Sequence, residues 1–129
     1  MAATDGTLPP SREVAIAAAR AAVGKQGEDV TVLDVRSVIV ITDFFVIVSG
    51  GSARQVRTIT ESIESALKEL GVKPVRREGE TEGQWVLLDY VDVVVHVFGE
   101  EERRYYDLER LWKDAGTLAW EDGDEASSG

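Results

Sequence analysis

The residues with the clearest chemical potential are a glycine-rich turn and two aspartates. The triplet Gly50-Gly51-Ser52 follows an apolar segment and precedes a helical one, so its backbone amides could bind a phosphate. A metal-dependent nucleotidyltransferase combines such a turn with two carboxylates at alternate strand positions, which point to one side and hold Mg²⁺. Here the available pair is Asp89 and Asp92, three positions apart and nearly forty residues downstream. A tight turn with Ser52 as helix N-cap explains the triplet better, and a nucleotidyltransferase or nucleotide-binding domain is kept as the alternative function.

The single histidine, His96, lies in the apolar sequence VVVHVF. With no cysteine and no second histidine, the chain offers no zinc site of the usual composition. General base catalysis requires a positioned nucleophile, and none is evident in the sequence. A hydrogen-bonded histidine in or near the core is therefore favoured over a pH-sensitive interface residue. We expect a binding protein rather than an enzyme, with no metal and no cofactor.

One segment, residues 82–112, collects most of the aromatic side chains. It contains the histidine, two of the three tryptophans and all three tyrosines, and residues 78–102 carry eight carboxylates with no lysine or arginine. Aromatic residues are common in interface hot spots, and opposite charges speed the encounter of two proteins. Strand alternation puts Trp85 and Asp89 on one side, which is expected to be partly open to solvent. A partner surface and the edge of the core both fit Trp85, and the whole segment suggests a basic partner.

Composition sets the general class of the protein. The chain has 129 residues, 43% of them hydrophobic, which suits one globular domain. Its net charge of −10 argues against direct nucleic-acid readout, because phosphate binding needs clustered lysine and arginine. No apolar run approaches the roughly 18 residues that span a membrane, and the N-terminus lacks a signal-peptide pattern. We expect a cytoplasmic protein.

Hydrophobic periodicity predicts an α/β domain with a mixed β-sheet covered by helices. Ser11 and Ser52 are the expected helix N-caps, and the last helix is expected to turn Tyr105, Leu108 and Trp112 towards the core. Residues 1–10 are predicted to be a disordered tail, 11–116 the folded domain and 117–129 an acidic flexible tail. The predicted helices cover residues 12–23, 53–70 and 100–115, and the predicted strands lie near 31–36, 43–48, 74–77, 84–89 and 92–98.

Three sequence blocks are distinctive: TDFFVIVSGGSARQV, EGETEGQWVLLDYVDVVVHVF and EEERRYYDLERLW. In order and spacing, from about Ala15 to Trp112, they resemble the ribosomal silencing factor family, also called Iojap-like proteins. The resemblance implies a nucleotidyltransferase-like fold without the catalytic carboxylates. It also implies binding to the large ribosomal subunit through its fourteenth protein, with steric block of small-subunit association. Translation would thereby be repressed under nutrient limitation, and homodimers are implied off the ribosome.

The resemblance further implies which residues bind the partner. The matching positions are the aromatic residue before the hairpin, the two hairpin acids, the histidine and an Arg-x-Tyr-x-Leu-Glu helix. With their neighbours, the expected partner-binding residues are Glu80, Glu82, Trp85, Leu87, Asp89, Asp92, His96, Arg104, Tyr106, Leu108 and Glu109.

The hairpin departs from the family pattern at Val91, where the family usually has glycine. A two-residue type I′ turn needs positive φ there, which a β-branched residue resists. We therefore expect a turn of another type or a slightly longer one. The acidic tail lies outside the family pattern and is assigned no role.

Overall fold

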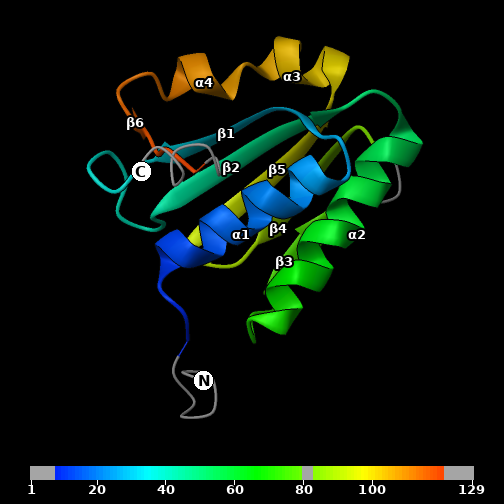
Figure 1. Cartoon of the computed structure of the whole chain (residues 1–129). Helices are drawn as coiled ribbons and strands as arrows, with labels where there is room; N and C mark the ends of the chain where they lie inside the picture. The colour runs from blue at the N-terminus through cyan, green and yellow to red at the C-terminus, as the bar shows by residue number, and fades with distance from the viewer. Residues whose placement is uncertain (1–7, 80–82, 121–129) are drawn as a thin grey trace, which may run out of the picture.

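A six-stranded mixed sheet forms the centre of the protein in the computed structural model, which describes residues 8–79 and 83–120 (Figure 1). The strands are β1 (Glu28–Asp34), β2 (Phe44–Gly50), β3 (Arg76–Glu78), β4 (Trp85–Asp89), β5 (Val93–Gly99) and β6 (Gly116–Thr117). The helices are α1 (Ser11–Gly24), α2 (Ala53–Glu69), α3 (Glu100–Tyr106) and α4 (Leu108–Leu111). The strand order is β3-β4-β5-β2-β1-β6, with β2 and β5 parallel and the other neighbours antiparallel. The predicted mixed α/β fold is confirmed.

Helices α1 and α2 cover one face of the sheet (Figure 1). Four residues of α2 recur at helical spacing and are fully buried: Val56, Ile59, Ile63 and Leu67. The helix begins as predicted, because Ser52 Oγ accepts a hydrogen bond from the Gln55 backbone N at 3.1 Å. Burying each aliphatic side chain contributes roughly 1.5–3 kcal/mol, so this stripe fixes α2 on the sheet.

The start of α1 differs from the prediction. Its N-cap is Pro10, which makes no side-chain capping bond, and Ser11 is the first helical residue. The Ser11 hydroxyl instead donates to Asp43 Oδ2 at 2.7 Å. The serine therefore ties the helix to the entrance of β2 rather than capping it.

Strands β4 and β5 form the predicted antiparallel hairpin, and alternation sorts their side chains as expected. Val86 and Val97 face α1 and α2, whereas Trp85 and Phe98 pack on the other side. The connecting turn is not type I′. The Asp92 backbone N donates to the Tyr90 carbonyl at 2.9 Å around Val91, whose φ is 74°. This is a γ-turn, so another turn type is confirmed, but the expectation that Val91 avoids positive φ is wrong.

The predicted continuous helix over residues 100–115 is also wrong. Asp107 adopts a left-handed conformation, with φ 48° and ψ 57°, and separates α3 from α4. The chain then returns to the sheet, where Thr117 pairs with Leu33 in β1. Trp120 packs against the core beneath α1 and α2, so residues 117–120 belong to the folded structure. The sequence predicts two tails, at residues 1–10 and 117–129. Residues 1–7 of the first and 121–129 of the second lie outside the described residues.

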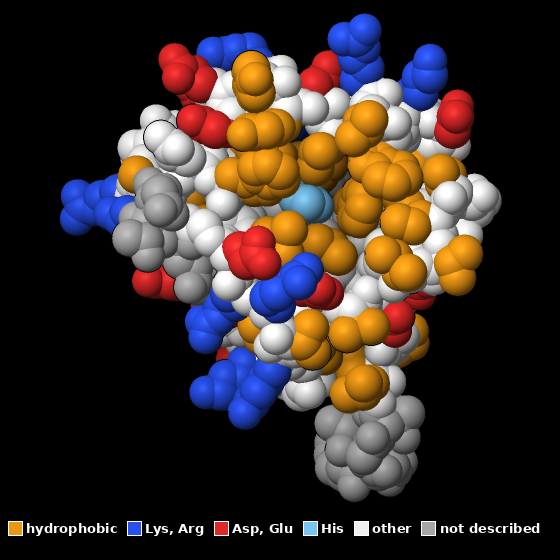
Figure 2. Space-filling view, turned by 180° about the vertical axis from the view of Figure 1, so that it is seen from behind, with side chains coloured by type: hydrophobic (Ala, Val, Ile, Leu, Met, Phe, Trp, Pro, Cys, Tyr) orange, Lys and Arg blue, Asp and Glu red, His pale blue; other side chains and the backbone are white. Residues whose placement is uncertain are grey.

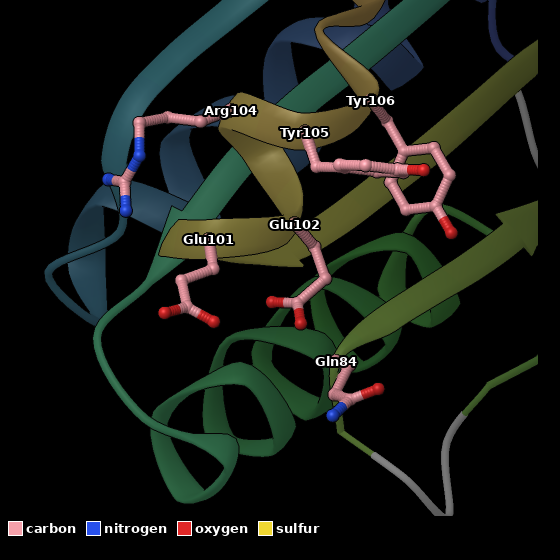
Figure 3. A pocket seen from close by; sticks show the side chains of 6 residues that line it. All are labelled: Gln84, Glu101, Glu102, Arg104, Tyr105 and Tyr106. Carbon is pink, nitrogen blue, oxygen red and sulfur yellow. The ribbon is translucent and has the colours of Figure 1, made fainter.

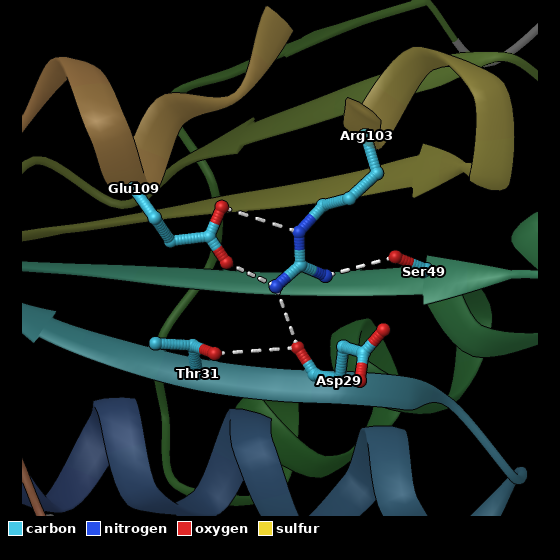
Figure 4. A network of polar contacts seen from close by, with 5 residues as sticks. All are labelled: Asp29, Thr31, Ser49, Arg103 and Glu109. Carbon is cyan, nitrogen blue, oxygen red and sulfur yellow. Dashed lines mark hydrogen bonds and ion pairs between the residues drawn. The ribbon is translucent and has the colours of Figure 1, made fainter. Parts of the chain in front are cut away.

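The side chain of Arg103 holds the two halves of the broken helix against the sheet (Figure 4). Its side chain, only 10% exposed, donates to Ser49 Oγ at 2.8 Å and to the Asp29 carbonyl at 2.7 Å. It also forms an ion pair with Glu109, which the break at Asp107 brings back towards the sheet. Arg103 therefore joins α3 and α4 to β1 and β2.

None of the helices in the described part of the chain is long and apolar enough to cross a membrane.

Candidate protein-interaction site

The face of the sheet opposite α1 and α2 is covered only in part, by α3 and α4. Leu108 from α4 packs there with Phe45, Ile47 and Phe98, but other apolar side chains remain accessible. Figure 2 shows these apolar side chains gathered across the centre of this side, with the histidine among them. We define the open face as this surface, formed by Ile39, Ile41, Trp85, Leu87, Val91, Val94, His96 and Tyr106.

Trp85 is the aromatic centre of the open face. Its ring centroid lies 5.0 Å from that of Phe98 and 4.4 Å from that of Tyr106, which descends from α3. The indole is half-buried, so the prediction that its side of β4 is partly open is confirmed. A rigid, preassembled aromatic cluster of this kind loses little conformational entropy on binding, which suits an interface anchor.

His96 lies beside Trp85 on the next strand and is 6% exposed. Its Nδ1 accepts a hydrogen bond from Trp85 Nε1 at 3.2 Å, and the Phe45 ring meets it edge-on at 5.3 Å. Burial in these surroundings lowers the pKa of His96 to about 4, so the ring is neutral at pH 7. The predicted hydrogen-bonded histidine in or near the core is confirmed.

A groove of about 290 Å³ extends the open face towards the hairpin turn. Leu87, Val94 and Val91 line it, and Asp89 lies at its rim beside Arg76, with Asp89 Oδ2 and Arg76 Nη2 3.4 Å apart. The other expected hairpin acid, Asp92, is exposed in the turn. The groove combines an apolar floor with an edge that carries both charges.

The loop between β1 and β2 adds apolar surface that the sequence analysis missed. Val40 is 98% exposed and Ile41 is 76% exposed, and Ile41 also lines the groove. The available signal was the length of the apolar run 38–48, which exceeds the strand that it contains. Exposed β-branched residues next to a groove are typical of a protein-interaction surface.

A second cavity, of about 550 Å³, lies beyond Tyr106 at the α3 end of the sheet (Figure 3). Glu101, Glu102 and Arg104 line it with Gln84 and the two neighbouring tyrosines. In Figure 3 the Glu102 side chain points towards Gln84, while the rings of Tyr105 and Tyr106 lie together on the opposite wall. Carboxylates beside tyrosine faces can hold a lysine or arginine side chain by ion pairing and cation–π contact.

The structure does not assemble all the expected partner-binding residues. Trp85, Leu87, His96 and Tyr106 converge on the open face, Asp89 lies at its rim, and Arg104 lines the second cavity. Leu108 instead lies in the core, and Glu109 is engaged by Arg103. We therefore assign these last two residues to the fold. The expected residues Glu80 and Glu82 lie outside the described residues.

The arrangement required by the alternative function does not form. Gly50 pairs with Gly99 at one end of parallel strands β2 and β5, whereas Asp92 precedes the other end of β5. Seven strand residues separate these positions by roughly 20 Å. The Gly51 backbone N is already bound to Gln55 Oε1 at 2.7 Å, so it is not free for a phosphate. Among the described residues, no cluster of three or more histidine or acidic side chains is placed to hold a metal ion.

Known proteins resemble this chain over most of its length. Residues 9–128 match the family described as "Ribosomal silencing factor during starvation". The ribosomal silencing factor RsfS of Halalkalibacterium halodurans is 40% identical over 111 residues, covering 86% of this chain and 95% of that protein. The crystal structure of a Chromobacterium violaceum protein superposes with a TM-score of 0.79 at 37% identity, covering 81% and 88% of the two chains.

A more distant relative, the mouse "Mitochondrial assembly of ribosomal large subunit protein 1", is 31% identical over 91 residues. The match covers 68% of this chain and 40% of the mouse protein. The agreement of the family match, the identity to RsfS and the shared structure confirms the resemblance inferred from the three sequence blocks. This chain belongs to the ribosomal silencing factor family.

Proposed function

We propose that this protein silences translation by binding the large ribosomal subunit through its fourteenth protein and sterically blocking association with the small subunit. The observation that carries the proposal is the open face, where half-buried Trp85 stands on an apolar sheet surface that α3 and α4 cover only in part. Family membership supports the silencing activity, and the name of the mouse relative supports the large subunit as the target.

The distribution of charge supports a basic protein partner. Residues 1–77 contain ten lysines and arginines and nine acidic residues, whereas residues 78–129 contain four and fifteen. Within the described part of the second range, 78–79 and 83–120, nine acidic residues face four basic ones, so part of the excess negative charge lies in the segment that supplies β4, β5 and α3, next to the open face. Ribosomal proteins carry excess positive charge because they bind RNA phosphates, so opposite potentials would steer the encounter.

In the proposed complex, apolar contacts lie at the centre of the open face and charged contacts lie at its rim. Trp85 and Leu87 are the proposed anchor, since they are half-buried and belong to a rigid strand. Asp89 and the glutamates of the second cavity would meet lysine and arginine side chains at the periphery. Silencing then requires only occupancy, because a bound domain of this size blocks the approach of the small subunit. Starvation would act by changing how much of the protein is present or free to bind.

Co-sedimentation with purified ribosomal particles tests this function directly. The protein should sediment with isolated large subunits, but not with small subunits or coupled ribosomes, and high salt should weaken the binding. Large subunits preloaded with the protein should fail to join small subunits in light scattering. Equal sedimentation with all three particles, or normal joining by saturated large subunits, would contradict the proposal.

The Trp85→Ala variant tests the anchor. Loss of a central aromatic anchor typically costs about 2 kcal/mol or more of binding free energy, so affinity for large subunits should fall about thirtyfold. The matched control is Val23→Ala, which removes an exposed apolar side chain from α1 on the opposite side of the sheet. If both variants are folded and lose the same affinity for large subunits, Trp85 is not the anchor.

We also propose that off the ribosome two copies associate through the same open face. An apolar surface of this kind is unfavourable in water unless it is covered. Analytical ultracentrifugation should therefore show a homodimer that Trp85→Ala weakens and that large subunits dissociate. A dimer that persists on the ribosome would place self-association on another surface.

A further inference from the structure

We propose that the Nε2–H group of His96 is a specificity-determining hydrogen-bond donor that the ribosomal partner must meet with a main-chain carbonyl oxygen. The inference rests on the proposed function, because it concerns the partner that covers the open face. It assigns to His96 a role that its burial alone does not suggest.

The tautomer of His96 follows from its neighbour. Trp85 Nε1 lies 3.2 Å from His96 Nδ1, and an indole nitrogen can only donate. Nδ1 must therefore be the acceptor and carry no proton. Since burial lowers the pKa of the ring to about 4, the ring is neutral at pH 7 and its single proton sits on Nε2. The Trp85 indole thus decides what His96 presents to a partner.

The surroundings of His96 leave this donor available. Strand pairing places Leu87 and Ile47 on either side of it, and the rings of Phe45 and Phe98 approach from the same face. None of these side chains can accept a hydrogen bond, and within the described parts of the chain no acceptor is placed for Nε2. Figure 2 shows the histidine reaching the surface at the centre of the apolar side chains. It is a polar point within an apolar surface.

A partner that covers this surface removes the water that the Nε2–H group would otherwise bind. A buried donor without an acceptor is unfavourable, so a partner that places an apolar group here would bind about tenfold more weakly or worse. The donor therefore selects against apolar partners, as well as for those with an acceptor at the right position.

The chemistry of a basic partner limits which of its groups can accept a hydrogen bond from His96 Nε2–H. Lysine and arginine side chains, which a basic protein offers in excess, cannot accept a hydrogen bond. A carboxylate would approach against the negative charge of Asp89 and the glutamates of the second cavity. Hydroxyl and side-chain amide oxygens are neutral acceptors too, but they occur only on certain residues, whereas a main-chain carbonyl is neutral and is carried by every residue. We therefore infer that a backbone segment of the partner, rather than a charged side chain, lies over His96.

Because the chain has one histidine, nitrogen-15 labelling of histidine gives a signal without overlap. Multiple-bond NMR correlations at pH 7 should show the Nε2–H tautomer in the free protein. Addition of the isolated fourteenth protein of the large subunit should slow exchange of the Nε2 proton with water by at least tenfold. An Nδ1–H tautomer, or exchange that is unchanged in the complex, would overturn the inference.

Two variants give an independent measurement. His96→Gln keeps an acceptor for Trp85 and an N–H donor, whereas His96→Leu keeps neither. We expect His96→Leu to bind large subunits about tenfold more weakly than His96→Gln at equal folded fraction, and equal affinities would overturn the inference. If the leucine variant does not fold, the proton-exchange experiment decides alone. Absence of binding by the unmodified protein would instead overturn the proposed function, and this inference with it, even where the tautomer is as expected.

Discussion

Asp89 and Val91 are joined by a hydrogen bond at the start of the γ-turn that connects β4 to β5. Asp89 Oδ1 accepts from the Val91 backbone N at 2.8 Å, while Asp89 Oδ2 faces Arg76. Val91 itself has φ 74°, a conformation that is costly for a β-branched residue. The carboxylate thus stabilises a strained turn at the edge of the proposed binding surface.

Replacing Val91 with glycine should relieve this strain. Glycine adopts positive φ without steric cost, although it loses more backbone entropy on folding. We expect Val91→Gly to increase the free energy of unfolding by about 1 kcal/mol, measured by urea denaturation. The control is Val40→Gly, which removes an equally branched and almost fully exposed side chain where φ is not positive. The strain argument fails if Val91→Gly is no more stable than the unmodified protein.

Arg103 should matter far more for stability than its neighbour Arg104. Removing the Arg103 guanidinium leaves Glu109 and Ser49 without this partner in a partly buried site. We expect Arg103→Ala to lower the free energy of unfolding by about 2–3 kcal/mol. Arg104 is exposed, so Arg104→Ala should change it by less than about 0.5 kcal/mol. Guanidinium denaturation of the two variants would show this contrast, and similar losses would argue against the network in Figure 4.

The low pKa of His96 predicts a pH-dependent stability. Folding favours the neutral ring, so the stabilisation is complete above the ordinary pKa of 6.5 and is lost as the pH falls towards about 4. At 1.36 kcal/mol per pH unit, the loss attributable to His96 is about 3 kcal/mol. Because carboxylates titrate in the same range, the measurement is the difference in unfolding free energy between the unmodified protein and His96→Gln at several pH values. A difference that does not change between pH 7 and pH 4 would contradict the assignment.

Tyr106 should contribute to binding through Trp85. Its ring is 4.4 Å from the indole and 44% exposed, whereas the adjacent Tyr105 is 81% exposed and contacts Tyr106 rather than Trp85. An aromatic pair contributes about 0.5–1.5 kcal/mol, so Tyr106→Ala should weaken binding to large subunits about fivefold. Tyr105→Ala should weaken it less than about twofold. The reverse order in co-sedimentation would indicate that the partner contacts the outer side of α3.

The sequence patterns predicted the parts of the protein that depend on interactions between residues close together in the chain. Helix α2 followed from its apolar spacing and from Ser52, whose capping bond spans three residues. Alternation along β4 and β5 separated Val86 from Trp85, because successive strand residues must face opposite sides of a sheet. It also suggested that the Trp85 side is accessible. The apolar neighbours of His96, with no second histidine and no cysteine in the chain, favoured a hydrogen-bonded histidine in or near the core.

Contacts between distant segments set the features that the patterns missed. The helical periodicity of residues 100–115 continues through Asp107, but the left-handed turn there brings Glu109 onto Arg103 and allows Thr117 to pair with Leu33. Such contacts leave no periodic trace, since their partners are up to 84 residues apart in the sequence. The bond between Trp85 and His96 is of the same kind. Strand alternation puts both on one side of the sheet, but only the register of β4 against β5 brings the indole N–H to the imidazole nitrogen.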